Sequence, residues 1–381
     1  MTHTDFQLYW WLIISLLGAL LVFLMMIQGA QVLMHCLKRR NPEWSELIFT
    51  TISHKWELTF TTLVTFGGAF FASFPLFYST SFSGAFYVWI ILLITFVLQG
   101  AAYGLRNREG NLLGKNTYNA FLLLNGFLAP LIVGVAVGTF FYGANFTVNY
   151  ANIGLDAQNA TISSWSTAWH GLEALACVPC LILGLAVMSL TQTLGAQFII
   201  NRVQDEKLKI RTEKWVRYPA VAFVVLFVTF LALLMTKDGF AVGDKGVVYM
   251  EPYKYLTNFI EMPIIAAVFL VGVLLVLFGI YKTIVQKSRK AIWFSGLGTV
   301  LTVTTLLLIA GYNNTAYYPS VFDLQSSLTI SNSSSSEFTL KVMSYASLMI
   351  PFVFAYIWFV WRAMTRKQTT QKEVDDAKEL Y

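Results

Sequence analysis

The sequence predicts an all-α polytopic membrane protein with nine transmembrane helices. Apolar runs of about 20 residues recur from one end of the chain to the other, and a run of that length spans a hydrocarbon core of roughly 30 Å. Only 12% of the residues are charged, whereas about 25% are charged in an average soluble domain. Lys and Arg are concentrated in alternate connections between these runs, which is typical of proteins that cross a membrane many times.

The predicted spans follow one another with mostly short connections. In the connection after the first span, Asn41 can cap a helix that begins at Pro42, with Trp44, Leu47 and Ile48 on one face. That pattern predicts a short amphipathic helix along the membrane surface. The nine spans cover residues 8–35, 57–79, 82–105, 117–141, 165–200, 217–236, 258–281, 290–312 and 339–362.

The distribution of positive charge predicts the orientation of the chain. The connections after the first, third, fifth and seventh spans, together with the C-terminal tail, hold 22 of the 26 Lys and Arg residues. Because such connections stay in the cytoplasm, we expect the N-terminus outside and the C-terminus inside. The net charge of +6 reflects this orientation and does not indicate nucleic-acid binding. The three longest connections then lie outside, and the Ser-rich stretch SSLTISNSSSSEF in the last of them is expected to lack regular structure.

A short motif occurs twice and indicates an internal duplication. Gly29-Ala30-Gln31 ends the first span, and a basic connection then leads to Lys55-Trp56. Gly195-Ala196-Gln197 ends the fifth span, and a second basic connection leads to Lys214-Trp215. An offset of four spans preserves orientation, so the repeats would be parallel. We therefore expect two parallel four-helix bundles, residues 1–141 and 142–312, followed by residues 313–381 with an outer loop, a peripheral ninth helix and a cytoplasmic tail.

Glu57 stands at the cytoplasmic start of the second span, where a carboxylate has two interpretations. An ionisable group at mid-bilayer costs about 2.5–3.5 kcal/mol, so intramembrane carboxylates are rare and are often functional. Glu57 could exchange protons at a water-filled entrance. It could instead be an interfacial carboxylate that the helix N-terminus favours, paired with Lys55. The uncharged polar side chains expected inside the spans are Gln28, Gln31, Gln99 and Asn125.

Other candidate residues have simpler structural interpretations. His170 and Glu173 are either a ligand pair or an interfacial polar pair. Glu261 lies where the first turn of a helix would hold it. Cys177 and Cys180, in the segment CVPC, are either a redox or metal pair or small packing residues beside a proline kink.

The chain does not carry the residues that bond chemistry of its own would need. Haem inside a membrane usually needs paired histidines, and no two of the four histidines are placed mid-membrane on facing spans. The sequence also has no Gly-rich phosphate loop and no Ser-His-Asp set. We therefore expect no catalytic residue, no cofactor ligand and no metal ligand in this chain.

The stretch around the second span resembles a known family. Trp56-Glu57 is followed by a Gly-Gly pair and then by FASFP, which ends with Phe74 and Pro75. The N-terminal Tyr9-Trp10-Trp11 cluster and the later Asn258-Phe259 pair belong to the same pattern. The pattern closely resembles the second subunit of cytochrome bd-type quinol oxidases, and the resemblance extends over the whole chain.

The resemblance implies a subunit of a respiratory oxidase in the bacterial cytoplasmic membrane. Its partner, a haem-bearing subunit I of similar fold, would hold haem b and haem d, and the heterodimer would oxidise quinol and reduce dioxygen to water. This chain would ligate no haem, stabilise subunit I and supply part of a proton path from the cytoplasm. Membrane lipid and small single-helix accessory subunits are further expected partners.

The resemblance also implies roles for particular residues. Glu57 resembles the family's carboxylate on a proton path toward the haems. Where many members carry an acidic motif late in the first span, this chain has Gln28 and Gln31, which cannot exchange a proton as a carboxylate does but can hold water. Gln99 stands near the position of the family's basic residue in the third span, whereas Arg106 is retained. The implied proton path therefore comprises Glu57, Gln28 and Gln31.

A secondary transporter with parallel internal repeats is the alternative from a different class. Transporters of that kind bind their substrate at the midplane, between broken helices. The sequence indicates no midplane cluster of charges and no obviously broken helix pair, which favours the oxidase subunit. A purely structural partner without a proton role is a third possibility.

Overall fold

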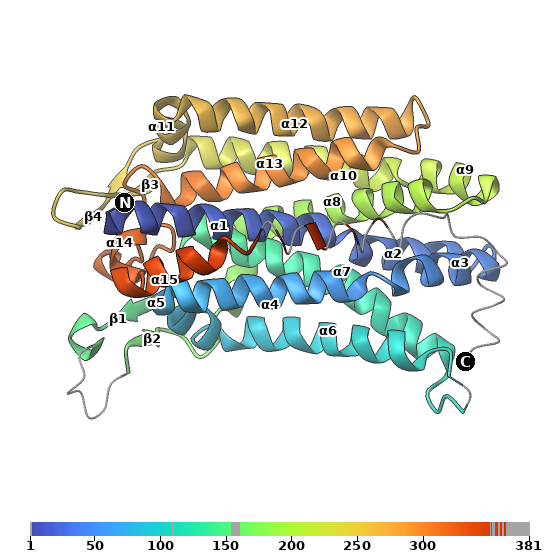
Figure 1. The fold of residues 1–381 in the computed structure, drawn as a ribbon, viewed down its shortest axis with the longest axis horizontal. Helices are drawn as coiled ribbons and strands as arrows, with labels where there is room; N and C mark the ends of the chain where they lie inside the picture. The colour runs from blue at the N-terminus through green and yellow to red at the C-terminus, as the bar shows by residue number, and fades with distance from the viewer. Residues whose placement is uncertain are drawn as a thin grey trace.

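The computed structural model describes residues 2–350, except 109 and 154–160, together with residues 352, 355, 356, 359 and 362. Long helices lie side by side along the long axis, and two β-hairpins lie at the end that holds the N-terminus (Figure 1). Among the described residues, seven helical segments are long and apolar enough to cross a membrane, or eight when the bent pair Trp56–Ser73 and Pro75–Ser83 counts as one span. The all-α polytopic fold is therefore confirmed.

The predicted count of nine spans is not reached within these described residues. The helix α15 (Glu337–Ser347) occupies the start of the predicted span 339–362. Several residues after position 350, and the predicted cytoplasmic tail from residue 363 onward, lie outside the described part of the chain. The ninth transmembrane helix therefore stays a prediction.

Most of the other spans match their predicted ranges. The first consists of α1 (His3–Leu24) and α2 (Met26–Lys38), which meet at Met25. The predicted span 258–281 is divided at Met262, because Pro263 ends α11 (Lys254–Glu261) and opens α12 (Pro263–Ile284). The remaining long helices that match are α6 (Phe86–Leu105), α7 (Gly114–Tyr142), α10 (Arg217–Thr236) and α13 (Ala291–Gly311).

The second span is broken at the end of the molecule that holds the N-terminus, although one continuous span was predicted. The helix α4 (Trp56–Ser73) ends before Phe74, and α5 (Pro75–Phe77) with the π-helix η1 (Tyr78–Ser83) turns away by 117°. Pro75 has no N–H to continue the helix, and the buried Phe74 fills the corner. Ser335 stabilises the bend because its N–H donates to the Ser73 carbonyl at 2.8 Å.

The fifth span begins later than predicted. The helix α8 (Val178–Arg202) starts 13 residues after position 165, with Pro179 in its first turn. The preceding segment instead forms the strand β2 (Ser163–Trp165), a turn at Gly171 with φ of 96°, and the 3-10 helix η3 (Leu172–Leu175). The aromatic residues of this segment were mistaken for part of the apolar span.

The described parts of the connections at the N-terminal end of the molecule contain regular structure. The strand β1 (Phe146–Val148) pairs with β2 in antiparallel register, and β3 (Gly239–Val242) pairs likewise with β4 (Val248–Glu251). The Ser-rich stretch contains the short helix α14 (Ile330–Ser333), so the expectation that it lacks regular structure is wrong there. Thr329 and Asn332 form a reciprocal capping box that satisfies the free N–H groups of α14. A 3-10 turn, η4 (Leu324–Ser326), precedes it.

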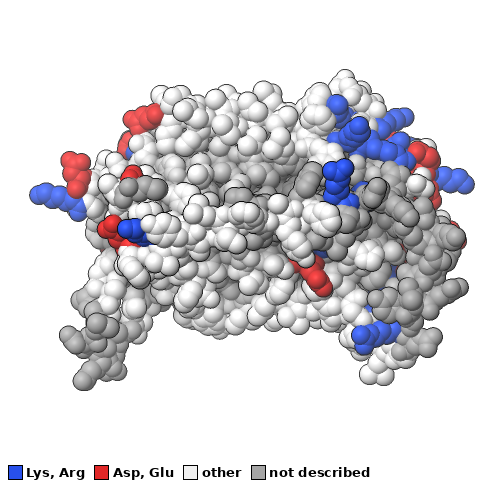
Figure 2. Space-filling model, in the orientation of Figure 1, with Lys and Arg blue, Asp and Glu red and all other residues white. Residues whose placement is uncertain are grey.

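The surface helix predicted after the first span is confirmed as α3 (Pro42–Ser53). The Asn41 side chain caps it by accepting the Glu43 N–H at 2.9 Å, and Pro42 occupies the first turn. Leu47 and Ile48 are buried against the helices behind them. A second helix, α9 (Glu206–Trp215), lies at the same end of the molecule, where Lys and Arg side chains gather (Figure 2).

The two copies of the repeated Gly-Ala-Gln motif meet where α2 packs against α8. A Cβ on Gly195 would lie 2.3 Å from the backbone nitrogen of Ala30, and a Cβ on Gly29 would lie 1.9 Å from the Thr191 carbonyl oxygen. Only glycine allows the two backbones to approach this closely. The repeated motif therefore forms a close backbone contact between α2 and α8.

Candidate functional site

A buried cluster of polar side chains lies between α2, α6 and α7. Gln28 and Gln31 come from successive turns of α2, and both are fully buried. Gln28 donates a long hydrogen bond of 3.5 Å to Gln99 on α6, and Gln31 donates a 3.0 Å hydrogen bond to the hydroxyl of Tyr103. Asn125 on α7 is also fully buried. We call Gln28, Gln31, Gln99, Tyr103 and Asn125 the glutamine cluster.

The glutamine cluster has more polar atoms than protein partners. Five of its buried side-chain atoms find no hydrogen-bond partner within the described part of the chain: Gln28 Oε1, Gln31 Oε1, Gln99 Nε2, and Asn125 Oδ1 and Nδ2. A buried amide atom without a partner costs about 1–3 kcal/mol. Space with several such atoms is suited to water molecules, each of which needs two to four polar partners.

Aromatic rings cover the cluster on the side of the positively charged end. The Tyr103 ring stacks on Trp56, with 5.5 Å between centroids and 15° between planes, and it also packs on Phe49 at 5.4 Å. Its hydroxyl meets Gln31 at the edge of the cluster. The motif residue Trp56 therefore positions Tyr103, which the sequence analysis did not single out.

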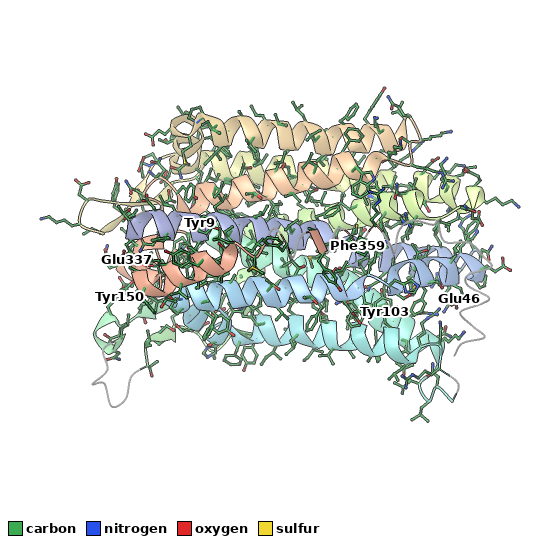
Figure 3. The ribbon with its side chains drawn as sticks, in the orientation of Figure 1. Tyr9, Glu46, Tyr103, Tyr150, Glu337 and Phe359 are labelled. Atoms are coloured by element: carbon green, nitrogen blue, oxygen red, sulfur yellow. The ribbon has the colours of Figure 1, made fainter. Side chains whose placement is uncertain are left out.

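An ion pair lies beyond Tyr103, nearer the end of the molecule (Figure 3). Arg106, which is 1% exposed, donates hydrogen bonds of 2.8 Å to both carboxylate oxygens of Glu46 on α3. Its Nε donates to Asn119 on α7 at 2.8 Å, and its guanidinium lies 4.2 Å from the centroid of the Phe49 ring. Arg106 thus joins α3, α6 and α7 at this end of the cluster.

Glu57 lies apart from the glutamine cluster. It is exposed in the first turn of α4, and it makes no hydrogen bond or ion pair with any described residue. The predicted pairing with Lys55 is not found in this part of the structure. The structure thus brings Gln28 and Gln31 together, while Glu57 is connected to them only through its neighbour Trp56 and the ring of Tyr103.

Lys55 points in the opposite direction, into the protein. It is 4% exposed, and its Nζ lies 4.8 Å from the centroid of the Phe198 ring on α8. Burial lowers the pKa of Lys55 to about 7, and the positive charge of Arg202 acts in the same direction. Lys55 therefore contributes to the packing of the start of α4 against α8 instead of neutralising Glu57.

The motif residues Phe74 and Pro75 have a structural role at the end of α4. Phe74 lies in a buried aromatic cluster, 5.8 Å from Trp11 and 5.9 Å from Tyr317 between centroids. The indole N–H of Trp11 donates to the Leu307 carbonyl at 3.0 Å, which ties α1 to α13. The FASFP motif therefore fixes the bend at the end of α4 against the core.

The remaining acidic candidates make local structural contacts. Glu173 accepts hydrogen bonds from the Thr167 hydroxyl and from the Gly171 N–H, and His170 Nδ1 lies 3.1 Å from the Gly84 carbonyl. Glu261 accepts from Asn313 at 2.5 Å. No group of three or more His, Cys, Asp or Glu side chains within the described residues could hold a metal ion.

Three comparisons with known proteins agree with one another. A family model described as cytochrome bd terminal oxidase subunit II matches residues 6–364. Cytochrome bd-I ubiquinol oxidase subunit 2 of Escherichia coli is 26% identical over 375 residues, which cover 94% of each chain. Cytochrome bd ubiquinol oxidase subunit 2 of Bacillus subtilis is 26% identical over 336 residues, or 86% of each chain.

The fold is also similar to a solved structure. A chain of the bd oxidase from Geobacillus thermodenitrificans superposes with a TM-score of 0.60 over 94% of this chain and 98% of that one, at 11% sequence identity. At that identity the superposition shows the fold alone. Because the family model spans nearly the entire sequence, the chain belongs to the cytochrome bd terminal oxidase subunit II family.

Proposed function

We propose that this chain is the haem-free second subunit of a quinol oxidase, which stabilises a haem-bearing subunit I and carries part of a proton path from the cytoplasm. Family membership supports the assignment to an oxidase complex, as do relatives named as ubiquinol oxidase subunits. The observation that carries the proton role is the glutamine cluster, whose four amide side chains are fully buried inside an otherwise apolar helix bundle.

Water held by the glutamine cluster would conduct the protons. Gln28 and Gln31 have no exchangeable acid, but the five unpaired atoms of the cluster are the donors and acceptors that a chain of water molecules requires. Protons would enter beside Tyr103 and Arg106 at the positively charged end. This assignment replaces the direct carboxylate chain expected of many family members with a water-based segment.

Glu57 would pass protons on at the boundary with the partner subunit. Its carboxylate is exposed on α4, a helix that also exposes the apolar residues Val64 and Phe71. Apolar residues such as Leu93 and Val97 are exposed on the neighbouring α6. Because lipid also covers apolar surface, the carboxylate at its edge, and not the apolar residues, is what favours a protein partner here.

The proposed assembly has the N-terminus outside and nine helices in two parallel bundles plus one. The gathering of Lys and Arg at one end supports this orientation (Figure 2). The contact between Gly29 and Gly195 supports the division into residues 1–141 and 142–312. We assign haem b, haem d and quinol oxidation to the partner, with lipid and single-helix accessory subunits around the heterodimer in the bacterial cytoplasmic membrane.

Purification of the complex tests this proposal. The affinity-tagged chain is expressed together with a candidate partner, a membrane protein with paired histidines. We expect both chains to elute together, with reduced-state absorption bands of b-type and d-type haem, while the chain expressed alone carries no haem. A secondary transporter would instead move solute in liposomes without any partner, and that result would overturn the assignment.

A further inference from the structure

The segment Cys177-Val-Pro-Cys180 opens α8 at the end of the molecule opposite the Lys- and Arg-rich end. Cys177 is the N-cap residue, with an extended backbone at φ of −72° and ψ of 104°, and Cys180 lies in the first turn. The side chain of an N-cap residue reaches the backbone of the residue two or three positions later, so Cys177 and Cys180 are neighbours at the start of α8. That placement suits a disulfide bond, which needs two neighbouring Cβ atoms.

The two thiols differ in their access to solvent. Cys177 is half-buried and lines a cavity of about 180 Å³, together with Glu173, Trp165 and Tyr142. Cys180 is fully buried behind it, against the backbone of α7: a Cβ on Gly138 would lie 3.1 Å from its sulfur. Packing accounts for a small residue at position 180. It does not account for a second thiol at position 177, which faces the cavity.

The surroundings of Cys177 favour its thiolate. A hydrogen bond from Cys180 holds the pKa of the Cys177 thiol below its usual range, and the nearby positive charge of Lys237 acts in the same direction. Lys237 is itself held beside the cavity, with its Nζ 5.2 Å from the ring centroid of Tyr142. An accessible thiolate with a buried second thiol behind it is the arrangement that thiol–disulfide exchange uses.

We propose that Cys177 and Cys180 form a reversible dithiol–disulfide pair that reacts with low-molecular-weight disulfides of the outer compartment. Compartments outside the cytoplasm are oxidising, so such disulfides are available there. The cavity beside Cys177 matches a small molecule better than a protein disulfide. A metal site is the weaker interpretation of the segment, because the described residues supply no third ligand.

The proposed exchange balances in two steps. The Cys177 thiolate attacks one sulfur of the external disulfide RSSR, forms a Cys177–SR bond and releases RS⁻, which takes up the proton that Cys177 lost. The Cys180 thiol, losing its proton, then attacks the Cys177 sulfur and releases the second RS⁻, which is protonated to RSH. Two protein thiols are oxidised to one disulfide, and one external disulfide is reduced to two RSH.

Alkylation of the full-length chain in its membrane tests this proposal. In a Cys36→Ser background, membranes are equilibrated with mixtures of 2-mercaptoethanol and 2-hydroxyethyl disulfide, quenched with acid, denatured and labelled with polyethylene glycol maleimide. We expect both tags to disappear together as the disulfide fraction rises, and to return with dithiothreitol. The proposal that the two cysteines form a disulfide would be overturned if the chain kept two tags in every mixture. It would also be overturned if the tags were lost one at a time.

Single variants separate the two thiols. Cys180→Ser should accumulate a stable adduct of Cys177 with mercaptoethanol, seen by mass spectrometry, whereas Cys177→Ser should leave Cys180 free and fully labelled. An adduct on Cys180 rather than Cys177 would contradict the assigned order. Elution of each variant at the wild-type position in size-exclusion chromatography checks the fold. The thiol count does not depend on oxidase activity, so its outcome is separate from that of the proposed function.

Discussion

Arg106 and Glu46 form a two-point ion pair that closes the polar cluster at the positively charged end of the molecule. Both hydrogen bonds measure 2.8 Å, and the arginine side chain is 1% exposed while that of the glutamate is 21% exposed. A planar guanidinium matches the two oxygens of a carboxylate, which makes such pairs stronger than single contacts. This ion pair therefore joins the surface helix α3 to the transmembrane helix α6.

Replacing Glu46 with alanine should destabilise the protein strongly. The change leaves a buried guanidinium without its counter-charge, and breaking a buried pair in this way costs about 3–5 kcal/mol. We expect the lower part of that range, because Glu46 is partly exposed. Glu46→Gln keeps one hydrogen-bond acceptor and should lose less. Thermal denaturation of the detergent-solubilised complex compares the two variants, and equal midpoints for wild type and Glu46→Ala would contradict the role of the pair.

Replacing Glu57 with glutamine should slow oxygen uptake several-fold without changing the haem content. Glutamine keeps the size and polarity of the side chain but cannot exchange a proton at neutral pH. Glu57→Asp should retain most of the activity, because it keeps the carboxylate. The measurement is quinol-driven oxygen consumption, normalised to the haem spectrum of the same preparation.

Glu43→Gln serves as the matched control for this experiment. Glu43 is also an exposed carboxylate in the first turn of a helix, and it lies at the same end of the molecule, on α3. It has no contact with the glutamine cluster among the hydrogen bonds of the described residues, so its variant should respire normally. Normal uptake in Glu57→Gln would leave the chain a purely structural partner.

Replacing Tyr103 with phenylalanine should slow turnover while leaving the helix bundle intact. The ring stack with Trp56 and Phe49 is preserved, but Gln31 loses its hydroxyl partner and the glutamine cluster loses one polar group. We expect reduced oxygen uptake and a larger solvent isotope effect in deuterated water. Tyr9→Phe is the control, because the Tyr9 hydroxyl bonds to Ser347 at the opposite end. The same rate in both variants would argue against a path through Tyr103.

Substituting Gly195 should disturb the contact between α2 and α8. An alanine Cβ would lie 2.3 Å from the Ala30 nitrogen, so α2 and α8 must move apart. Gly68 on α4 has nothing within 4 Å of such a Cβ, and alanine stabilises an exposed helix position by roughly 0.5–1 kcal/mol over glycine. We therefore expect a lower denaturation midpoint for Gly195→Ala and an unchanged or higher one for Gly68→Ala, both measured on this chain without its partner, because Gly68 lies between Val64 and Phe71 on the surface assigned to that partner. Equal midpoints would show that the crossing tolerates a wider spacing.

The sequence predicted the end of a helix well where the residues at that end determine it by themselves. Asn41 followed by Pro42 gave the start of α3, because capping depends on those residues alone. The start of α8 was misplaced because Trp165 and Trp169 are as apolar as a membrane span, and nothing local reveals that Trp165 lies in a hairpin. The bend after Ser73 depends on Pro75, a signal that was visible but was taken only as part of a motif.

The candidate site was predicted in part. Gln28, Gln31 and Gln99 were expected inside the membrane because amides are rare in apolar spans, and the structure buries all three. Tyr103 and Glu46 were missed because tyrosine and glutamate are ordinary at a membrane interface. Their importance comes from neighbours distant in the sequence: Tyr103 meets Gln31, and Glu46 meets Arg106. Both contacts depend on which helices pack against each other. The sequence of one helix alone does not specify that packing.

The buried ammonium of Lys55 should make stability depend on pH. Its pKa falls from 10.5 to about 7 in the folded protein because burial disfavours the charged form. Between these values the unfolded chain binds more protons than the folded one, so stability should rise from about pH 7 toward pH 10 and stay level below pH 7. Lys55→Met removes the titrating group, so the rise should become smaller in that variant. Denaturation midpoints measured from pH 6 to pH 9 check this, with Lys245→Met, an exposed lysine at the other end, as the control. An equal slope in all three proteins would mean that Lys55 stays protonated in the fold.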